Sequence, residues 1–105
     1  MEQPNLTYID ELSEDNIEFK SKLIGILKNE LPNEIKGYRE EMENSNFSKA
    51  TQSVHKLKHK ISILGLEKSY YIAEEYEGNL KNNSTSLNAD FENILNIMQE
   101  FVNRL

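Results

Sequence analysis

Apolar residues recur along this chain at alternating intervals of three and four positions, the spacing that places side chains on one face of an α-helix. No segment alternates apolar and polar residues as a half-buried strand does, and only two prolines and four glycines interrupt the helical pattern. The chain is therefore predicted to be all-α. The central apolar stripe consists of Phe47, Ala50, Val54, Leu57, Ile61 and Leu64.

Turn-forming and capping residues divide this pattern into one short helix and four longer ones. Ser13 precedes the long second helix and is expected to cap its N-terminus, and Gly65 is expected to end the third helix in a left-handed conformation. Pro32 removes a backbone donor inside the long helix, which predicts a bend there; the alternative is a break at Leu31 into two helices. The expected helices cover residues 6–12, 14–43, 47–64, 67–80 and 88–105.

Four substantial amphipathic helices joined by short connections pack best as an antiparallel up-down four-helix bundle, here with a short extra N-terminal helix. The length of 105 residues fits one domain, over residues 1–105, with a single core. One chain supplies the whole bundle, so a monomer is expected. The sequence contains no cysteine, which excludes disulfides, thiol catalysis and thiolate metal sites.

The charge balance narrows the classes of partner. A net charge of −6 argues against general nucleic-acid binding, which depends on neutralising phosphates. No apolar run reaches the roughly 18 residues that a membrane span needs, and the N-terminal residues lack the pattern of a signal peptide. We therefore expect no nucleic-acid or membrane partner and a cytoplasmic location, with which the absence of cysteine is compatible.

One segment departs from this acidic character. Residues 44–66 contain four lysines and no carboxylate. At about 100° per residue, one helix face is expected to point away from the apolar stripe and to carry His55, Lys58, His59 and Ser62. A solvent-facing histidine in a local positive field is suited to holding or passing on an anionic group, and the basic patch fits an acidic protein partner.

Three interpretations of His55 are open, and the first is an ordinary surface histidine. The second is metal binding together with His59, since the two residues are spaced i and i+4. However, two ligands make a poor site, and Lys56, Lys58 and Lys60 repel a cation, so no metal is expected. The third is nucleophilic chemistry, because a neutral imidazole can form a covalent intermediate and Lys58, at i+3, is close enough to stabilise a phosphoryl group.

The segment around His55 resembles the signature of the histidine-containing phosphotransfer (HPt) domain of multistep phosphorelays. That signature is His-x-Leu-Lys-Gly, followed by a glycine ten residues after the histidine. The order of the expected helices agrees with the family as well: a long helix with an internal proline, a short turn, the histidine helix and two more helices. The resemblance extends over nearly the whole chain. The residues that match in identity and spacing are His55, Leu57, Lys58 and Gly65.

His59 departs from the family pattern, in which a glycine four residues after the histidine gives the partner's active site room to approach. Either the partner docks with a complementary gap, or His59 rotates away and donates a hydrogen bond to the phosphate. Slowed or restricted transfer is the third interpretation. Phosphorylation of His59 itself is disfavoured, because the register of Leu57, Lys58 and Gly65 indicates His55 as the acceptor.

The resemblance implies a phosphocarrier rather than an enzyme. Phosphate would arrive on His55 from an aspartyl phosphate in the receiver domain of a hybrid histidine kinase, and it would leave to the receiver of a response regulator. The receiver would bring magnesium and an acidic pocket, so the chain needs no cofactor, and Lys58 would stabilise the phosphate. Autophosphorylation from ATP is not expected, because no glycine-rich nucleotide-binding segment is present and Lys56 stands where dimerising kinase helices carry an acidic residue.

The competing hypothesis is a pseudo-HPt interaction module, which docks an acidic partner through the basic patch without chemistry. Such a module would bind a receiver with or without His55. The remaining features are interpreted as structural, and Tyr70, Tyr71 and Tyr76 are expected to pack in the core or at its rim. Solvent exposure is expected for Lys49, Lys60, Glu74, Glu75 and Glu77. An exposed ring of apolar residues beside His55 is expected to include Tyr8, Ile9 and Leu12.

Overall fold

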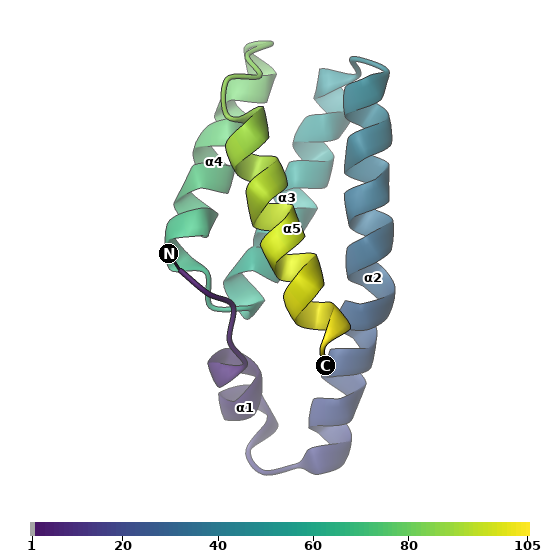
Figure 1. The fold of residues 1–105 in the computed structure, drawn as a ribbon, viewed down its shortest axis with the longest axis vertical. Helices are drawn as coiled ribbons and strands as arrows, with labels where there is room; N and C mark the ends of the chain where they lie inside the picture. Colours follow the sequence, from purple (N-terminus) through teal and green to yellow (C-terminus); the bar gives the residue numbers. More distant parts are fainter. Residues whose placement is uncertain (1) are drawn as a thin grey trace.

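The computed structural model describes residues 2–105, and over that range the chain forms five helices and no strand. The predicted all-α class is therefore confirmed. The histidine helix α3 packs against both α2 and α4, and α5 packs against α2 and α4, while α1 lies beside the first part of α2 (Figure 1). The helices are α1 (Thr7–Ser13), α2 (Ile17–Glu43), α3 (Phe47–Ile63), α4 (Glu67–Lys81) and α5 (Asn88–Asn103).

The long helix α2 is continuous through Pro32, so the alternative of a break at Leu31 is wrong. Its N-terminal cap is also not the predicted one. The Asn16 side chain accepts a hydrogen bond from the backbone N–H of Phe19 at 3.0 Å. Ser13 instead lies in the last turn of α1, where its buried hydroxyl donates to the Ile9 carbonyl at 2.7 Å. The short helix runs one residue further than expected, which removes Ser13 from the capping position.

The first turns of α2 extend beyond the other long helices, and α1 packs against this extension (Figure 1). Ile9 is consequently buried, so its predicted place in an exposed ring beside His55 is wrong. Tyr8 and Leu12 are exposed. The chain just before α1 is held at the far end of α3, because the Asn5 N–H donates to the Leu64 carbonyl at 2.9 Å.

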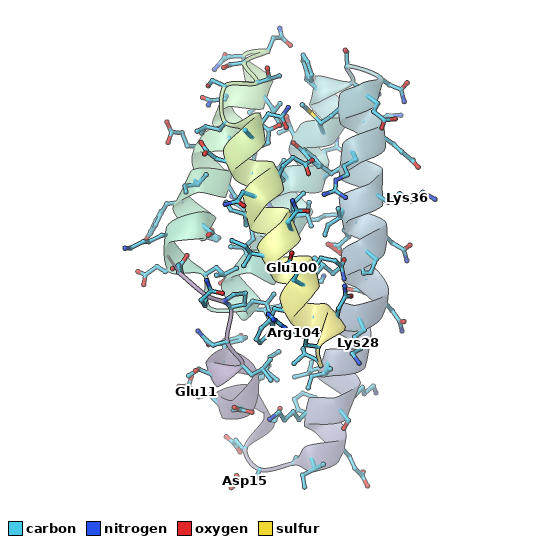
Figure 2. The ribbon with its side chains drawn as sticks, viewed as in Figure 1. Glu11, Asp15, Lys28, Lys36, Glu100 and Arg104 are labelled. Carbon is cyan, nitrogen blue, oxygen red and sulfur yellow. The ribbon has the colours of Figure 1, made fainter. Side chains whose placement is uncertain are left out.

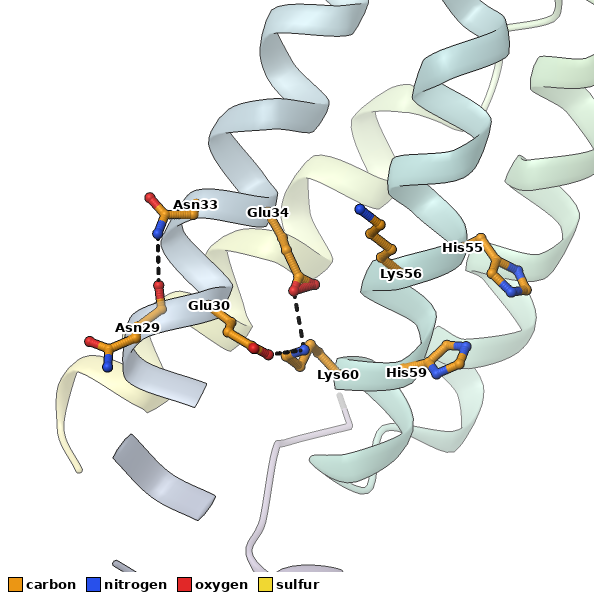
Figure 3. A pocket seen from close by; sticks show the side chains of 8 residues that line it. All are labelled: Asn29, Glu30, Asn33, Glu34, His55, Lys56, His59 and Lys60. Atoms are coloured by element: carbon orange, nitrogen blue, oxygen red, sulfur yellow. Dashed lines mark hydrogen bonds and ion pairs between the residues drawn. The ribbon is translucent and has the colours of Figure 1, made fainter. Parts of the chain in front are cut away.

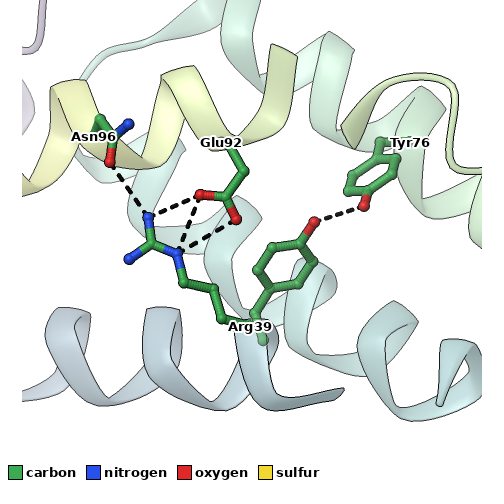
Figure 4. Close-up of polar contacts among 5 residues, drawn as sticks. Arg39, Tyr76, Glu92 and Asn96 are labelled. Atoms are coloured by element: carbon green, nitrogen blue, oxygen red, sulfur yellow. Dashed lines mark hydrogen bonds and ion pairs between the residues drawn. The ribbon is translucent and has the colours of Figure 1, made fainter. Parts of the chain in front are cut away.

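The core contains a cluster of aromatic rings that joins α2, α4 and α5. The hydroxyls of Tyr38 and Tyr76 lie 2.5 Å apart, and the Tyr38 ring meets the Phe91 ring edge-on at 5.0 Å between centroids. Burial raises the pKa of both tyrosines, so both hydroxyls stay protonated. They share one hydrogen bond, and the Tyr76 hydroxyl also donates to Sδ of Met42 at 3.8 Å. Beside this cluster, Arg39 of α2 donates to the Glu92 carboxylate of α5 at 2.8 and 3.1 Å (Figure 4).

Charged side chains cover the outside of the helices. Glu11, Lys36 and Glu100 are examples that point away from the packed interior (Figure 2). No helix in residues 2–105 combines the length and the apolar character of a membrane span. The α2–α3 turn and the α3–α4 turn are tight, with Ser45 at φ 52° and Gly65 at φ 74°. The predicted role of Gly65 at the end of the histidine helix is therefore confirmed.

Replacing Gly65 with alanine is expected to lower the free energy of unfolding by about 1–3 kcal/mol, because a β-carbon is strained at positive φ. That carbon would also meet the Asn5 side chain at 2.6 Å. The matched control is Gly78→Ala in α4, where an added β-carbon meets nothing within 4 Å and helix propensity predicts a gain of up to about 1 kcal/mol. Urea unfolding followed by circular dichroism measures both. Equal stabilities of the two variants would contradict the expectation.

Candidate functional site

His55 lies in the middle of α3, and its side chain is 58% exposed. Its Nδ1 atom lies 3.3 Å from Oε1 of Glu77, which comes from the neighbouring helix α4. A carboxylate accepts hydrogen bonds and does not donate them when ionised, so this contact favours the tautomer that carries its proton on Nδ1. The lone pair of Nε2 is then free to act as a nucleophile on the exposed side of the ring. The predicted exposure of His55 is confirmed.

The predicted exposure of Lys58 to solvent is wrong. Its side chain is only 9% exposed, its Nζ atom lies 3.2 Å from Glu77 Oε1, and it sits 5.5 Å from the centroid of the Tyr70 ring. The position follows from the helix: Lys58 is one residue past Leu57, at the flank of the buried stripe that α4 covers. The aliphatic stem packs in the interface and the ammonium reaches a carboxylate. Lys58 and His55 therefore share one oxygen of Glu77.

The predicted position of Glu77 on a solvated acidic face is wrong, because its side chain is only 14% exposed. Lys81 adds a longer contact of 3.8 Å to its second oxygen. Partial burial opposes ionisation of Glu77, but hydrogen bonding and charge from Lys58, with a smaller effect from His55, lower the pKa below its usual value of 4.5. A carboxylate is thus held in place between the two residues that the sequence singled out. Glu74 and Glu75, on the same helix, are exposed as predicted.

His59 is exposed one turn after His55, and the two rings lie edge to face with 5.3 Å between their centroids. The two residues help line an open hollow of about 570 Å³ between α2 and α3, but their rings point away from α2 (Figure 3). Lys56 points toward the α2 side of this hollow, while the histidine rings lie on the outer side of α3 (Figure 3). No three histidine, cysteine or acidic side chains among residues 2–105 stand together as a metal site would require.

The predicted solvent exposure of Lys60 is wrong. Its side chain is 13% exposed, and its Nζ atom lies 2.9 Å from Glu30 and 3.1 Å from Glu34, both on α2 (Figure 3). The basic segment is therefore partly neutralised by carboxylates of its neighbours, at Lys58 by α4 and at Lys60 by α2. Lys49 is exposed, as predicted, and so is Lys56.

The contribution of Glu77 to stability is expected to depend on pH. Because the folded chain lowers its pKa, the contribution is complete above the ordinary value of 4.5 and is lost as pH falls through the lower value of the folded chain. The difference in unfolding free energy between the wild type and Glu77→Gln should therefore stay constant from neutral pH down to 4.5 and shrink below that pH. Chemical denaturation at several pH values measures this difference. Because both proteins contain all the other acidic residues, the pH-dependent contributions of those residues cancel in the comparison. A difference that does not shrink below pH 4.5 would contradict the expectation.

Comparison with known proteins adds no assignment: no family model, curated protein or solved structure matches this chain. The functional argument consequently depends on the site itself. Its geometry consists of an exposed imidazole, a carboxylate that holds one ring nitrogen, and a buried ammonium on the same carboxylate.

Proposed function

We propose that this chain is a histidine phosphotransfer protein, which accepts a phosphoryl group on Nε2 of His55 from the aspartyl phosphate of one receiver domain and passes it to another. The observation that carries the proposal is the exposed His55 ring with Nδ1 held by the Glu77 carboxylate. The resemblance of the segment to the HPt signature also supports His55 as the phosphoryl acceptor. In this proposal α2–α5 form an antiparallel up-down four-helix bundle, and α1 is the short extra helix.

The transfer step uses the Nε2 lone pair. It attacks the phosphorus of the aspartyl phosphate, the bond from phosphorus to the aspartyl oxygen breaks, and the aspartate leaves as a carboxylate with the bonding electrons. The ring keeps its proton on Nδ1 and becomes positively charged as the new bond forms. Glu77, at 3.3 Å from Nδ1, is placed to stabilise that charge. Transfer to the second receiver is the same reaction in reverse.

Lys58 has a less direct role than its spacing implied. Its ammonium is held by Glu77 beside the imidazole, so in the unphosphorylated chain it balances the carboxylate. Once a phosphoryl group is on His55, the same ammonium contributes positive potential at the anionic site. Lys58 is therefore proposed as a residue that tunes the field around His55, in addition to the phosphate stabilisation that the family resemblance implies.

The proposed partners of the chain are two receiver domains. The receivers of a hybrid histidine kinase and of a response regulator would supply magnesium and the acidic pocket, as the resemblance implies. The chain would act as a monomeric phosphocarrier in the cytoplasm, without a cofactor and without kinase activity of its own. The alternative of a pseudo-HPt docking module has less support, because Lys58 and Lys60 face carboxylates and the basic patch is correspondingly weaker.

The test is phosphoryl transfer from a receiver phosphorylated with radiolabelled phosphate. The wild-type chain is expected to become labelled, and the label should be lost in acid and retained in base, as a phosphorus–nitrogen bond requires. Incubation with ATP alone should give no label. Binding of the phosphorylated receiver without any transfer would favour the docking module, and labelling from ATP alone would contradict the carrier role.

A further inference from the structure

His59 stands next to the proposed phosphoryl acceptor on the same exposed face. The centroids of the His55 and His59 rings are 5.3 Å apart, with an angle of 64° between the ring planes. Residues spaced i and i+4 on a helix are surface neighbours. A phosphoryl group bound to Nε2 of His55 would project from the exposed side of that ring, so rotation of the His59 side chain brings a ring nitrogen within hydrogen-bonding reach of its oxygens.

The other nearby cations of α3 are already engaged or directed elsewhere. Lys58 is held by Glu77 and packed over Tyr70. Lys60 bridges to the carboxylates of α2, and Lys56 points toward the hollow rather than toward the outer face (Figure 3). His59 is thus the side chain on the outer face of α3 that can bring a positive charge to the phosphoryl group without breaking an existing ion pair.

Resting on the proposed function of His55, we propose that His59 is a positioning residue that donates a charge-assisted hydrogen bond to the phosphoryl group, so that retention of phosphate depends on pH. Histidine changes its charge between pH 5 and 8. A bound dianion favours the protonated ring, and by reciprocity the protonated ring favours the bound phosphate. Because the site is exposed, the expected effect is about two- to fivefold, the range of a surface ion pair.

Most charges that face this region from the three helices are already held in ion pairs. The acids of α2 are paired with Lys60, and the acid of α4 is paired with Lys58. A phosphoryl group on His55 is therefore the largest change in charge that the His59 ring experiences. The titratable and charged groups concerned are Glu30 and Glu34 on α2, His55, Lys56, Lys58 and Lys60 on α3, and Glu77 and Lys81 on α4.

The experiment uses phosphoramidate as a small phosphoryl donor, so that no receiver is needed. Nε2 of His55 attacks the phosphorus, the phosphorus–nitrogen bond of the donor breaks, and ammonia leaves. Nuclear magnetic resonance then follows the ring signals of His59 as pH is varied, in the phosphorylated and the unphosphorylated chain. We expect the proton affinity of His59 to be about two- to fivefold higher in the phosphorylated chain. The ¹⁵N signals of the rings identify which histidine carries the phosphoryl group.

Two variants separate charge from shape. His59→Gln keeps a polar side chain that does not titrate, and its phosphohistidine should hydrolyse about two- to fivefold faster than the wild type near pH 6 and at the same rate near pH 8.5. His59→Lys stays charged and should hold the phosphate longer than His59→Gln at both pH values. A merely structural role of His59 would not produce this pH dependence, because the ratio of two proteins cancels the intrinsic lability of phosphohistidine.

The possible failures are distinguishable. If His55 carries the phosphoryl group and the proton affinity of His59 is the same in both forms, the inference about His59 is overturned and the carrier role stands. If neither histidine is modified, or if His59 carries the phosphoryl group instead, the proposed function of His55 is itself overturned.

Discussion

Replacing His55 with glutamine is expected to reduce uptake of phosphate from a phosphorylated receiver by about a thousandfold or more, to background. Glutamine keeps a polar side chain of similar reach, but its amide has no lone pair basic enough to attack phosphorus. Because the side chain is 58% exposed, the substitution should change the free energy of unfolding by no more than about 0.5 kcal/mol. The measurement is the initial rate of labelling, with folding checked by circular dichroism.

The matched control is His59→Gln, which makes the same chemical change one helical turn away on the same exposed face. That variant should still become labelled, since the carrier role assigns the bond to His55. Undiminished labelling of His55→Gln would exclude His55 as the acceptor. Loss of labelling in both variants, with receiver binding intact, would mean that the two imidazoles act together rather than as acceptor and neighbour.

The apolar stripes of the helices allowed most of this fold to be predicted from the sequence. Alternating intervals of three and four placed Leu57, Ile61 and Phe91 in the core, and all three are buried. Gly65 and the turn before Phe47 located the ends of the histidine helix to within a residue or two. These features are local, because a helix face and a left-handed turn depend on residues close together in the chain.

The partners of the site could not be read in the same way. Glu77 is 22 positions from His55, and the contact exists only because α4 covers one flank of α3. Apolar periodicity gives the direction of a buried stripe but not the width of the interface on either side of it. Lys58 and Lys60 lie on the two flanks of the stripe. A projection of α3 alone places both in solvent, but the neighbouring helices α4 and α2 bury them.

One signal for Glu77 was nevertheless present. It follows Tyr76 directly in α4, whose buried residues are Ala73, Tyr76 and Leu80. Glu77 therefore follows a buried residue of α4 directly, just as Lys58 follows a buried residue of α3 directly. Two such flanking residues of opposite charge on helices that follow each other in the chain are candidates for an ion pair at the helix interface. Assigning which flank of each helix faces the other requires the packing.

Removing the carboxylate by Glu77→Ala is expected to slow phosphate uptake by His55 by about tenfold. After His55→Gln, this is the substitution with the largest expected effect on uptake. Loss of one preorganised hydrogen-bond partner in an enclosed site costs about a hundredfold or more, and this site is half open to water, so the smaller figure applies. The change also leaves Lys58 without its partner, and the free energy of unfolding should fall by about 1–3 kcal/mol. Rates are therefore measured well below the unfolding temperature.

Glu74→Ala is the matched control, since it removes the same charge from an exposed position of the same helix and should leave both quantities nearly unchanged. The opposite result for Glu77→Ala has a definite meaning. If uptake became faster, Glu77 would act in the wild type mainly by withholding the Lys58 ammonium from the phosphoryl group, and its hold on Nδ1 of His55 would be secondary. The double variant Glu77→Ala, Lys58→Met then decides between the two roles. It should stay about tenfold slow if the carboxylate orients the ring, and it should lose any gain in rate if the released ammonium was its source.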